Sequence, residues 1–312
     1  MLRWRSGLPG RRRGEWTGLW IFLFLLPFLV LYLGFTLWPL LATIIYSFFD
    51  WDGIQPLRAF VGLANYVEIA KDPVFWVSFR NTLVFAIANT AVKLPLSLLM
   101  AILLTKRWLK LKSLFRTVFF IPFVLPVSLA GLIFTYLLNP SNGALNAALH
   151  SLGVAHGSVD LLGHDETALA AVIGVSVWQV FGEYLVYWIA ALQNVPDELY
   201  EAAELDGASE WQKLVRITLP LIRPVAVIIA LLALINALHV FALIVTLTAG
   251  GPGVNTYVVS YFIYQQAFQE LPFRYGYASA AAVLFAALAL VFVTSQGYVV
   301  RQAQAARRET GV

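Results

Sequence analysis

The sequence predicts an all-α integral membrane protein with six transmembrane helices. Of its residues, 60% are hydrophobic and 12% are charged, whereas a soluble domain carries about 25% charged residues. The apolar residues form continuous blocks, and a helix that crosses a bilayer needs about 20 of them. Because backbone polar groups in lipid must pair within their own segment, we expect helices over residues 18–49, 78–105, 114–138, 168–193, 222–248 and 277–300.

The first block, residues 18–49, is too long for one straight helix and too short for two. We expect one tilted helix that bends or breaks near Pro27 or Pro39, because proline removes a helical hydrogen bond. Its apolar core exceeds the roughly 7–15 residues of a cleaved secretory signal. The block is therefore expected to be retained as the first span.

Basic residues divide unequally between the two sides of the predicted membrane. By the positive-inside rule, the richer side is the cytoplasm, so both termini and the segment 194–221 are expected there. We accordingly divide the chain into a basic N-terminal segment 1–17, a transmembrane domain 18–300 and a tail 301–312. The cytoplasmic side carries Arg3, Arg5, Arg11, Arg12, Arg13, Lys106, Arg107, Lys110, Lys112, Arg116, Lys213, Arg216, Arg223, Arg301, Arg307 and Arg308; the other side carries Arg58, Lys71, Arg80 and Arg274.

The segment 194–221, between the fourth and fifth spans, is the most structured polar part of the chain. It opens with acidic residues, which suit the positive end of a helix dipole. Gly207 suits the left-handed position after a helix end. Ser209 and Gln212 have the spacing of a capping box and begin a second helix, which we expect to end near Pro220. A chain this apolar that keeps such a loop is expected to present it to a partner in water.

Within this segment, Glu201-Ala202-Ala203 is followed after three residues by Gly207 and, nine residues later, by Ile217-Thr218-Leu219-Pro220. This spacing resembles the EAA loop of the permease subunits of bacterial ABC importers. Three other motifs are similar to those of the sugar permeases of maltose, glycerol-3-phosphate and trehalose importers. The third motif given below is typical of the first of the two permeases in such systems. The three motifs are Phe60-Val61-Gly62-Leu63-Ala64-Asn65-Tyr66, Asn81-Thr82-Leu83, and Thr248-Ala249-Gly250-Gly251-Pro252 followed by Thr256.

The resemblance implies a type I ABC importer permease in the bacterial inner membrane. Its partners would be a second homologous permease, two ATPase subunits, an external solute-binding protein and membrane lipid. The chain has no Gly-Lys dipeptide, so it has no Walker-type phosphate loop. We expect ATP and Mg to bind the separate ATPase, and this chain to be no enzyme and to hold no cofactor. By the resemblance, the coupling helix that docks on the ATPase comprises Glu201, Ala202, Ala203, Asp206 and Gly207.

Polar residues inside spans are the default candidates for function. Lys93 lies in the second span, Glu183 in the fourth, and Asn236 and His239 in the fifth. Lys93 and Glu183 either form a salt bridge between spans, contact the transported solute, or face a cavity without a role. His239 either lines the pathway or makes a hydrogen bond between helices.

The resemblance also suggests positions for a solute pocket and for a contact with the binding protein. Ala237 and Val240 offer no hydrogen bonds, and Glu183 is charged where an aromatic residue is expected, so the solute remains open. The Gly250-Gly251-Pro252 turn either touches the binding protein or is a tight loop that ends a span. The pocket positions are Trp178, Glu183, Asn236, Ala237 and Val240.

Two rival classes make different predictions. A secondary transporter driven by an ion gradient would use Lys93 and Glu183 as a relay, but it would leave the acidic loop without a purpose. A membrane-embedded enzyme would need a clustered polar site near an interface, and the sequence shows none. Its four histidines are not at ligand spacing, it has no cysteine, and its basic clusters at span ends indicate topology instead of nucleic-acid binding.

Overall fold

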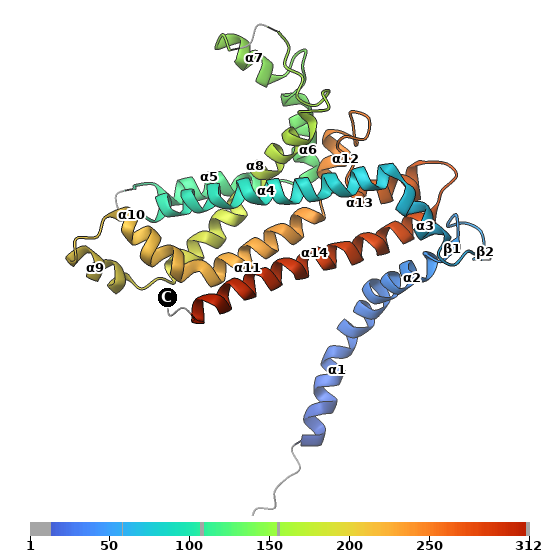
Figure 1. Ribbon diagram of the computed structural model, residues 1–312, viewed down its shortest axis with the longest axis horizontal. Coiled ribbons are helices and arrows are strands. Elements are labelled where there is room, and N and C mark those ends of the chain that lie inside the picture. Colours follow the sequence, from blue (N-terminus) through green and yellow to red (C-terminus); the bar gives the residue numbers. More distant parts are fainter. Residues whose placement is uncertain (1–13, 58, 107–108, 155–156, 310–312) are drawn as a thin grey trace, which may run out of the picture.

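The computed structural model describes residues 14–57, 59–106, 109–154 and 157–309 and is built almost entirely of helices (Figure 1). Most of the basic segment 1–17 and the end of the tail lie outside these residues. Five described stretches are long and apolar enough to cross a membrane, and a sharply bent helix pair makes a sixth when it is counted as one span. The six predicted spans are confirmed in this sense. The five stretches are Trp20–Tyr46, Pro73–Thr105, Ala168–Gln193, Glu210–Leu238 and Tyr275–Thr294.

Three helices form the centre of the bundle. They are α4 (Pro73–Thr105), α8 (Ala168–Gln193) and α11 (Leu219–Leu238), which pack against one another. A buried apolar cluster that includes Leu185 and Ile229 joins them. Figure 1 shows α4 and α11 running lengthwise, with α14 (Tyr275–Glu309) beside them.

The first span is continuous but changes its helical winding. It consists of α1 (Gly14–Tyr32), a π-helical segment η1 (Leu33–Leu37) and α2 (Trp38–Tyr46). The helix passes Pro27 without a break, and η1 ends two residues before Pro39. Because proline has no N–H to donate, the wider turn absorbs the mismatch. Figure 1 shows α1 leaning away from the bundle.

The predicted span 114–138 is not one straight helix. α5 (Lys112–Val124) and α6 (Val127–Leu137) meet at an angle of 96°. The break lies at Pro126: the residue before a proline disfavours helical geometry, and Leu125 is extended with ψ 136°. α6 then packs on α12 (Ala242–Leu247) at Gly131, where a Cβ atom would overlap the side chain of Thr246.

The predicted fifth span, 222–248, is displaced toward the N-terminus. The helix begins with α10 (Glu210–Lys213), continues through the π-helical segment η2 (Leu214–Thr218) and ends with α11 at Leu238. The expectation that a helix ends near Pro220 is therefore wrong. As in the first span, the π segment ends two residues before the proline, which lets the helix run on into the bundle.

Short elements connect the long helices, and polar side chains from the predicted motifs fasten two of these connections. The Asn65 amide donates to the carbonyls of Ser47 and Phe49 at 2.9 and 3.0 Å. Asn81 on α4 donates to the carbonyls of Asn255 and Tyr257 at 3.0 and 3.1 Å. The elements are β1 (Phe49–Asp50), β2 (Ala59–Phe60), α3 (Ala64–Lys71), α7 (Ala144–Ser151), α13 (Val259–Tyr264) and η3 (Gln265–Gln269), with β1 and β2 antiparallel.

Candidate functional site

The polar segment forms a separate helix at one end of the molecule. α9 (Asp197–Leu205) lies at the end of the bundle where α10 begins and where α14 finishes (Figure 1). Gly207 takes the left-handed conformation with φ +77°, and Ser209 and Gln212 form the predicted capping box. Local sequence signals therefore determined where this segment turns.

The predicted coupling residues lie together on α9 and on the turn that follows it. Glu201, Ala202, Asp206 and Gly207 are exposed, and Ala203 is half-buried. Within the described part of the chain, Glu201 makes no ion pair. Its carboxylate is therefore available to an outside partner.

Two large exposed apolar side chains, close in the chain to the coupling residues, were missed from the sequence. Leu205 is 90% exposed at the end of α9, and Trp211 is 71% exposed on α10. Exposed tryptophans are enriched at the centres of protein interfaces. The signal that could have revealed them in the sequence is the presence of a leucine and a tryptophan within a strongly acidic segment.

A charged cluster connects α9, α10 and the end of α4. Lys213 Nζ donates to the carboxylate of Glu204 on α9 at 2.8 Å and also pairs with Glu210 on its own helix. Lys106, which follows α4, pairs with the same Glu210. Lys213 was counted from the sequence only as a topological charge, and its buried position depends on long-range packing.

A cavity of about 1090 Å³ opens between α9 and the adjacent ends of α4 and α5. Glu198 and Glu201 line it from α9, and Lys112 and Arg116 line it from α5. Its two walls thus carry opposite charge. The cavity thus separates α9 from α5, while Lys213 and Thr218 line it from the helix that begins with α10.

Inside the bundle, Lys93 meets an aromatic ring instead of a carboxylate. Its Nζ lies 4.0 Å from the centroid of the Tyr184 ring, and the residue is 2% exposed. Glu183 instead accepts a hydrogen bond from the Tyr187 hydroxyl at 2.8 Å. The salt-bridge interpretation is therefore wrong for the described residues, and a cation–π contact holds the lysine.

The remaining predicted pathway residues are only partly brought together. The Asn236 amide donates to the Tyr184 hydroxyl at 3.4 Å, so the fifth span reaches the Lys93 site. Trp178 packs edge-on against Phe134 of α6, with ring centroids 4.9 Å apart.

Two further predicted residues lie next to Asn236 at the end of α11. Ala237 is buried, and Val240 follows in the break before α12. The exposed His239 ring hydrogen-bonds the Ile235 carbonyl at 2.8 Å within its own helix. The hydrogen bond of His239 thus does not join two helices.

The turn at Gly250, Gly251 and Pro252 lies at the opposite end of the molecule from α9. Gly250 has φ +83°, and a Cβ atom there would collide with the rings of Tyr257 and Tyr261. This explains the glycine in physical terms. The two threonines of the motif bind each other across the turn, with 2.8 Å between the Thr248 and Thr256 hydroxyls.

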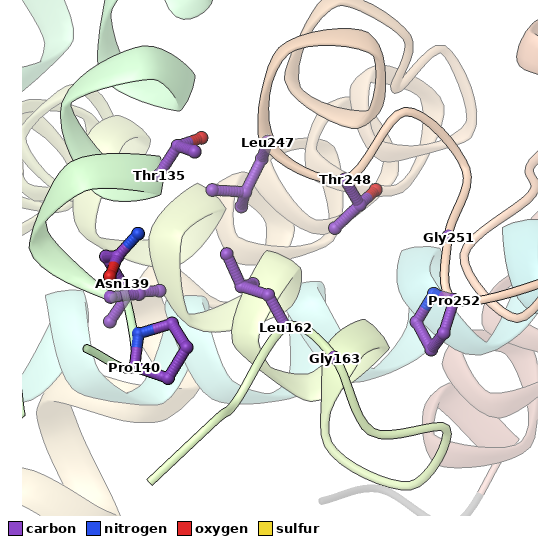
Figure 2. A pocket seen from close by; sticks show the side chains of 10 residues that line it. Thr135, Asn139, Pro140, Leu162, Gly163, Leu247, Thr248, Gly251 and Pro252 are labelled. Atoms are coloured by element: carbon purple, nitrogen blue, oxygen red, sulfur yellow. The ribbon is translucent and has the colours of Figure 1, made fainter. Parts of the chain in front are cut away.

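A second cavity, of about 380 Å³, adjoins this turn. Figure 2 shows Leu162 and Gly163 on one side, Pro252 beside them, and the end of α6 with Thr135 opposite. Among the residues that the structure describes, no three His, Asp or Glu side chains gather at metal-binding distance. The arrangement offers polar and aromatic contacts along a helical bundle, with an exposed helix at one end.

Comparison with known proteins places this architecture in a family. The model described as "Binding-protein-dependent transport system inner membrane component" matches residues 93–304. The chain is 37% identical over 270 residues to the probable ABC transporter permease protein YurN of Bacillus subtilis, covering 86% of this chain and 92% of that protein. It is 34% identical over 271 residues to the trehalose/maltose transport system permease protein MalF of Thermococcus litoralis, covering 87% and 90%.

Solved structures agree with the sequence relatives. A crystal structure of a bacterial ABC transporter involved in the import of the acidic polysaccharide alginate matches with a TM-score of 0.79 and 27% identity, covering 92% of this chain and 96% of that chain. A second crystal structure, of a bacterial alginate ABC transporter in complex with an alginate pentasaccharide-bound periplasmic protein, gives 0.80, 25% and the same coverage. The chain therefore belongs to the binding-protein-dependent inner membrane components, the permease subunits of ABC transporters.

Proposed function

We propose that the chain is a permease subunit of an ATP-driven importer for a sugar or related polyol, and that α9 couples it to a separate ATPase. The observation that carries the coupling role is the exposed surface of Glu201, Leu205 and Trp211 at one end of the bundle. This surface combines a free acid with apolar anchors, which is the composition of an interface. The sugar class is supported by relatives such as the MalF protein of Thermococcus litoralis.

The other partners follow from the family and from the opposite end of the fold. A second permease would complete the pathway, with Lys93, Glu183 and Asn236 on this chain's side of it. An external solute-binding protein would meet the outer end, where the Gly250–Pro252 turn borders the 380 Å³ cavity. Support for this partner comes from the alginate transporter that was crystallised with its periplasmic protein. Both chain ends would lie in the cytoplasm with α9.

The proposal is tested by reconstituting the chain with its partner permease and ATPase, and measuring ATP hydrolysis and solute uptake in vesicles. Co-purification of the ATPase and hydrolysis stimulated by the solute-loaded binding protein are the expected results. Uptake that continues without ATP and stops on addition of an uncoupler would instead establish an ion-gradient mechanism.

The apolar anchor gives a sharper prediction. Leu205→Asp is expected to weaken ATPase association by about 2 kcal/mol, roughly 30-fold, since it places an uncompensated charge at a buried contact. The measurement is the amount of ATPase that co-purifies at a series of concentrations. Leu152→Asp is the matched control, because Leu152 is a comparably exposed leucine, at 74%, near α7. Equal loss in both variants would contradict a docking role for α9.

Lys93 and Glu183 form no ion pair with each other in the described structure, and each has its own aromatic partner. The double reversal Lys93→Glu with Glu183→Lys should therefore support no more uptake than the weaker single reversal. Uptake by the three variants, normalised to the amount of chain in the membrane, measures this. Recovery of uptake in the double variant would show that the two charges pair during transport.

A further inference from the structure

α9 is joined to one span by two separate contacts. In the first, Lys213 Nζ holds the carboxylate of Glu204 on α9 at 2.8 Å. In the second, the Tyr200 hydroxyl on α9 lies 2.8 Å from Thr218 Oγ1 in η2. We call these four residues the α9 clamp. Lys213 and Thr218 both belong to the continuous helix that leads into α11.

In the first contact, the lysine is buried and its carboxylate partners are exposed. The Lys213 side chain is 9% exposed, whereas those of Glu204 and Glu210 are 64% exposed. A buried lysine is almost always paired. Moving the two carboxylates away would leave the charged amine of Lys213 buried without a partner, which is costly, so the contact is held in place. The buried Thr218 hydroxyl also donates to the Lys213 carbonyl at 3.3 Å. Both halves of the clamp therefore converge on the same helical turn.

Among the described residues, no hydrogen bond or ion pair joins α9 to α5. The cavity of about 1090 Å³, which the four clamp residues also line, separates α9 from Lys112 and Arg116 of α5. The link to α8 is the short segment 194–196 between the two helices. A force applied to α9 thus reaches α11 through the clamp, in addition to α8 through this short segment.

We propose that the α9 clamp makes α9 and α11 move as one body, so that displacement of α9 becomes a tilt of the fifth span. This inference rests on the proposed function, in which the ATPase moves α9. α11 has 20 residues and is therefore roughly 30 Å long. Near its far end, Asn236 contacts Tyr184, and the Tyr184 ring makes the cation–π contact with Lys93. Lys213 and Tyr200 are positioning residues: they connect the ATPase contact to this group without touching solute.

The test compares ATP hydrolysis with solute uptake in the reconstituted transporter. Lys213→Met is expected to lower uptake about tenfold while hydrolysis changes less than about twofold, because the ATPase still docks but its motion is not transmitted. Tyr200→Phe removes one hydroxyl and should lower uptake about threefold. The double variant should lose more than the product of the two, since each contact partly replaces the other. Lys213→Arg should restore most of the uptake.

Lys110→Met is the matched control and should leave both rates unchanged, because within the described part of the chain this exposed lysine forms no hydrogen bond or ion pair with α9. An unchanged ratio of ATP hydrolysed to solute imported in Lys213→Met would overturn the clamp. An equal fall in hydrolysis and uptake is one such result, and it would indicate that the ATPase no longer docks. If that variant does not insert, Glu204→Ala removes the same contact from an exposed side chain and should raise the ratio about threefold. Failure of the proposed function is distinguishable, because the unmodified chain would then bind no ATPase.

Discussion

Glu201→Lys is expected to abolish solute uptake while the chain still inserts into the membrane. Glu201 is exposed on α9, and in the described structure it forms no ion pair, so its reversal leaves the fold intact and acts on the docked partner. Loss of one member of a close charge pair at an interface costs about 2–5 kcal/mol, which lowers association roughly 30-fold to several thousand-fold. Uptake in vesicles, corrected for the amount of inserted chain, is the measurement.

A second acid on the same helix provides the control. Glu198 is also exposed, and it lies one turn before Glu201. Glu198→Lys should retain most of the uptake, because reversing it changes the overall charge of α9 by the same amount without removing the docking carboxylate. If both variants lose uptake equally, the general acidity of α9 is responsible and the specific role of Glu201 is wrong. Normal uptake in Glu201→Lys would refute the docking role altogether.

Gly182→Ala is expected to lower stability strongly. A Cβ atom at this position would lie against the backbone of Phe119 and Phe120, 2.6 Å from the Phe120 Cα. Small residues permit such close approach between membrane helices, and backbone cannot move aside as a side chain can. Overpacking of this kind costs about 3 kcal/mol. The measurement is the melting temperature of the purified chain in detergent.

The same helix contains its own control for this substitution. Gly174 of α8 has no neighbouring atom within 4 Å of an added Cβ. Gly174→Ala should therefore leave the melting temperature unchanged. A comparable loss of stability in both variants would mean that helix flexibility, and not the contact between α5 and α8, explains the result.

Local signals in the sequence predicted the parts of the fold that depend on local physics. The limits of α8 coincide with the predicted span 168–193, because its apolar block is bounded by polar residues on both sides. Gly207 and the pair Ser209 and Gln212 act through their own backbone turns. No distant contact is needed to explain them.

Prolines show where this reasoning stops. Pro95 and Pro224 lie inside helices that continue, whereas the chain breaks before Pro126. The bend there is accompanied by the packing of α6 on α12 at Gly131, against the distant Thr246. Each of these segments contains a proline, yet only one of them breaks. Whether the helix continues or breaks therefore depends on tertiary contacts that a single sequence does not reveal.

The sequence predicted which polar residues lie inside the spans, but not which side chains they contact. Lys93 is buried against α8 as expected, yet it meets Tyr184 and not Glu183. Consecutive residues on a helix point about 100° apart, so an error of one position replaces a carboxylate with an aromatic ring. The role of Lys213 was missed for the same reason, since its burial depends on the packing of α9.

The π-helical segment η2 has a further consequence for the fifth span. A π turn contains one residue more than an α turn, so it rotates the helix that follows by about 100° around its own axis. This single added residue sets the angular phase between Lys213, which faces α9, and Ala233, which is fully buried in the bundle. A chain that lost one residue between them would keep every span and every charge. It would still turn either the lysine into open water or the alanine face toward lipid.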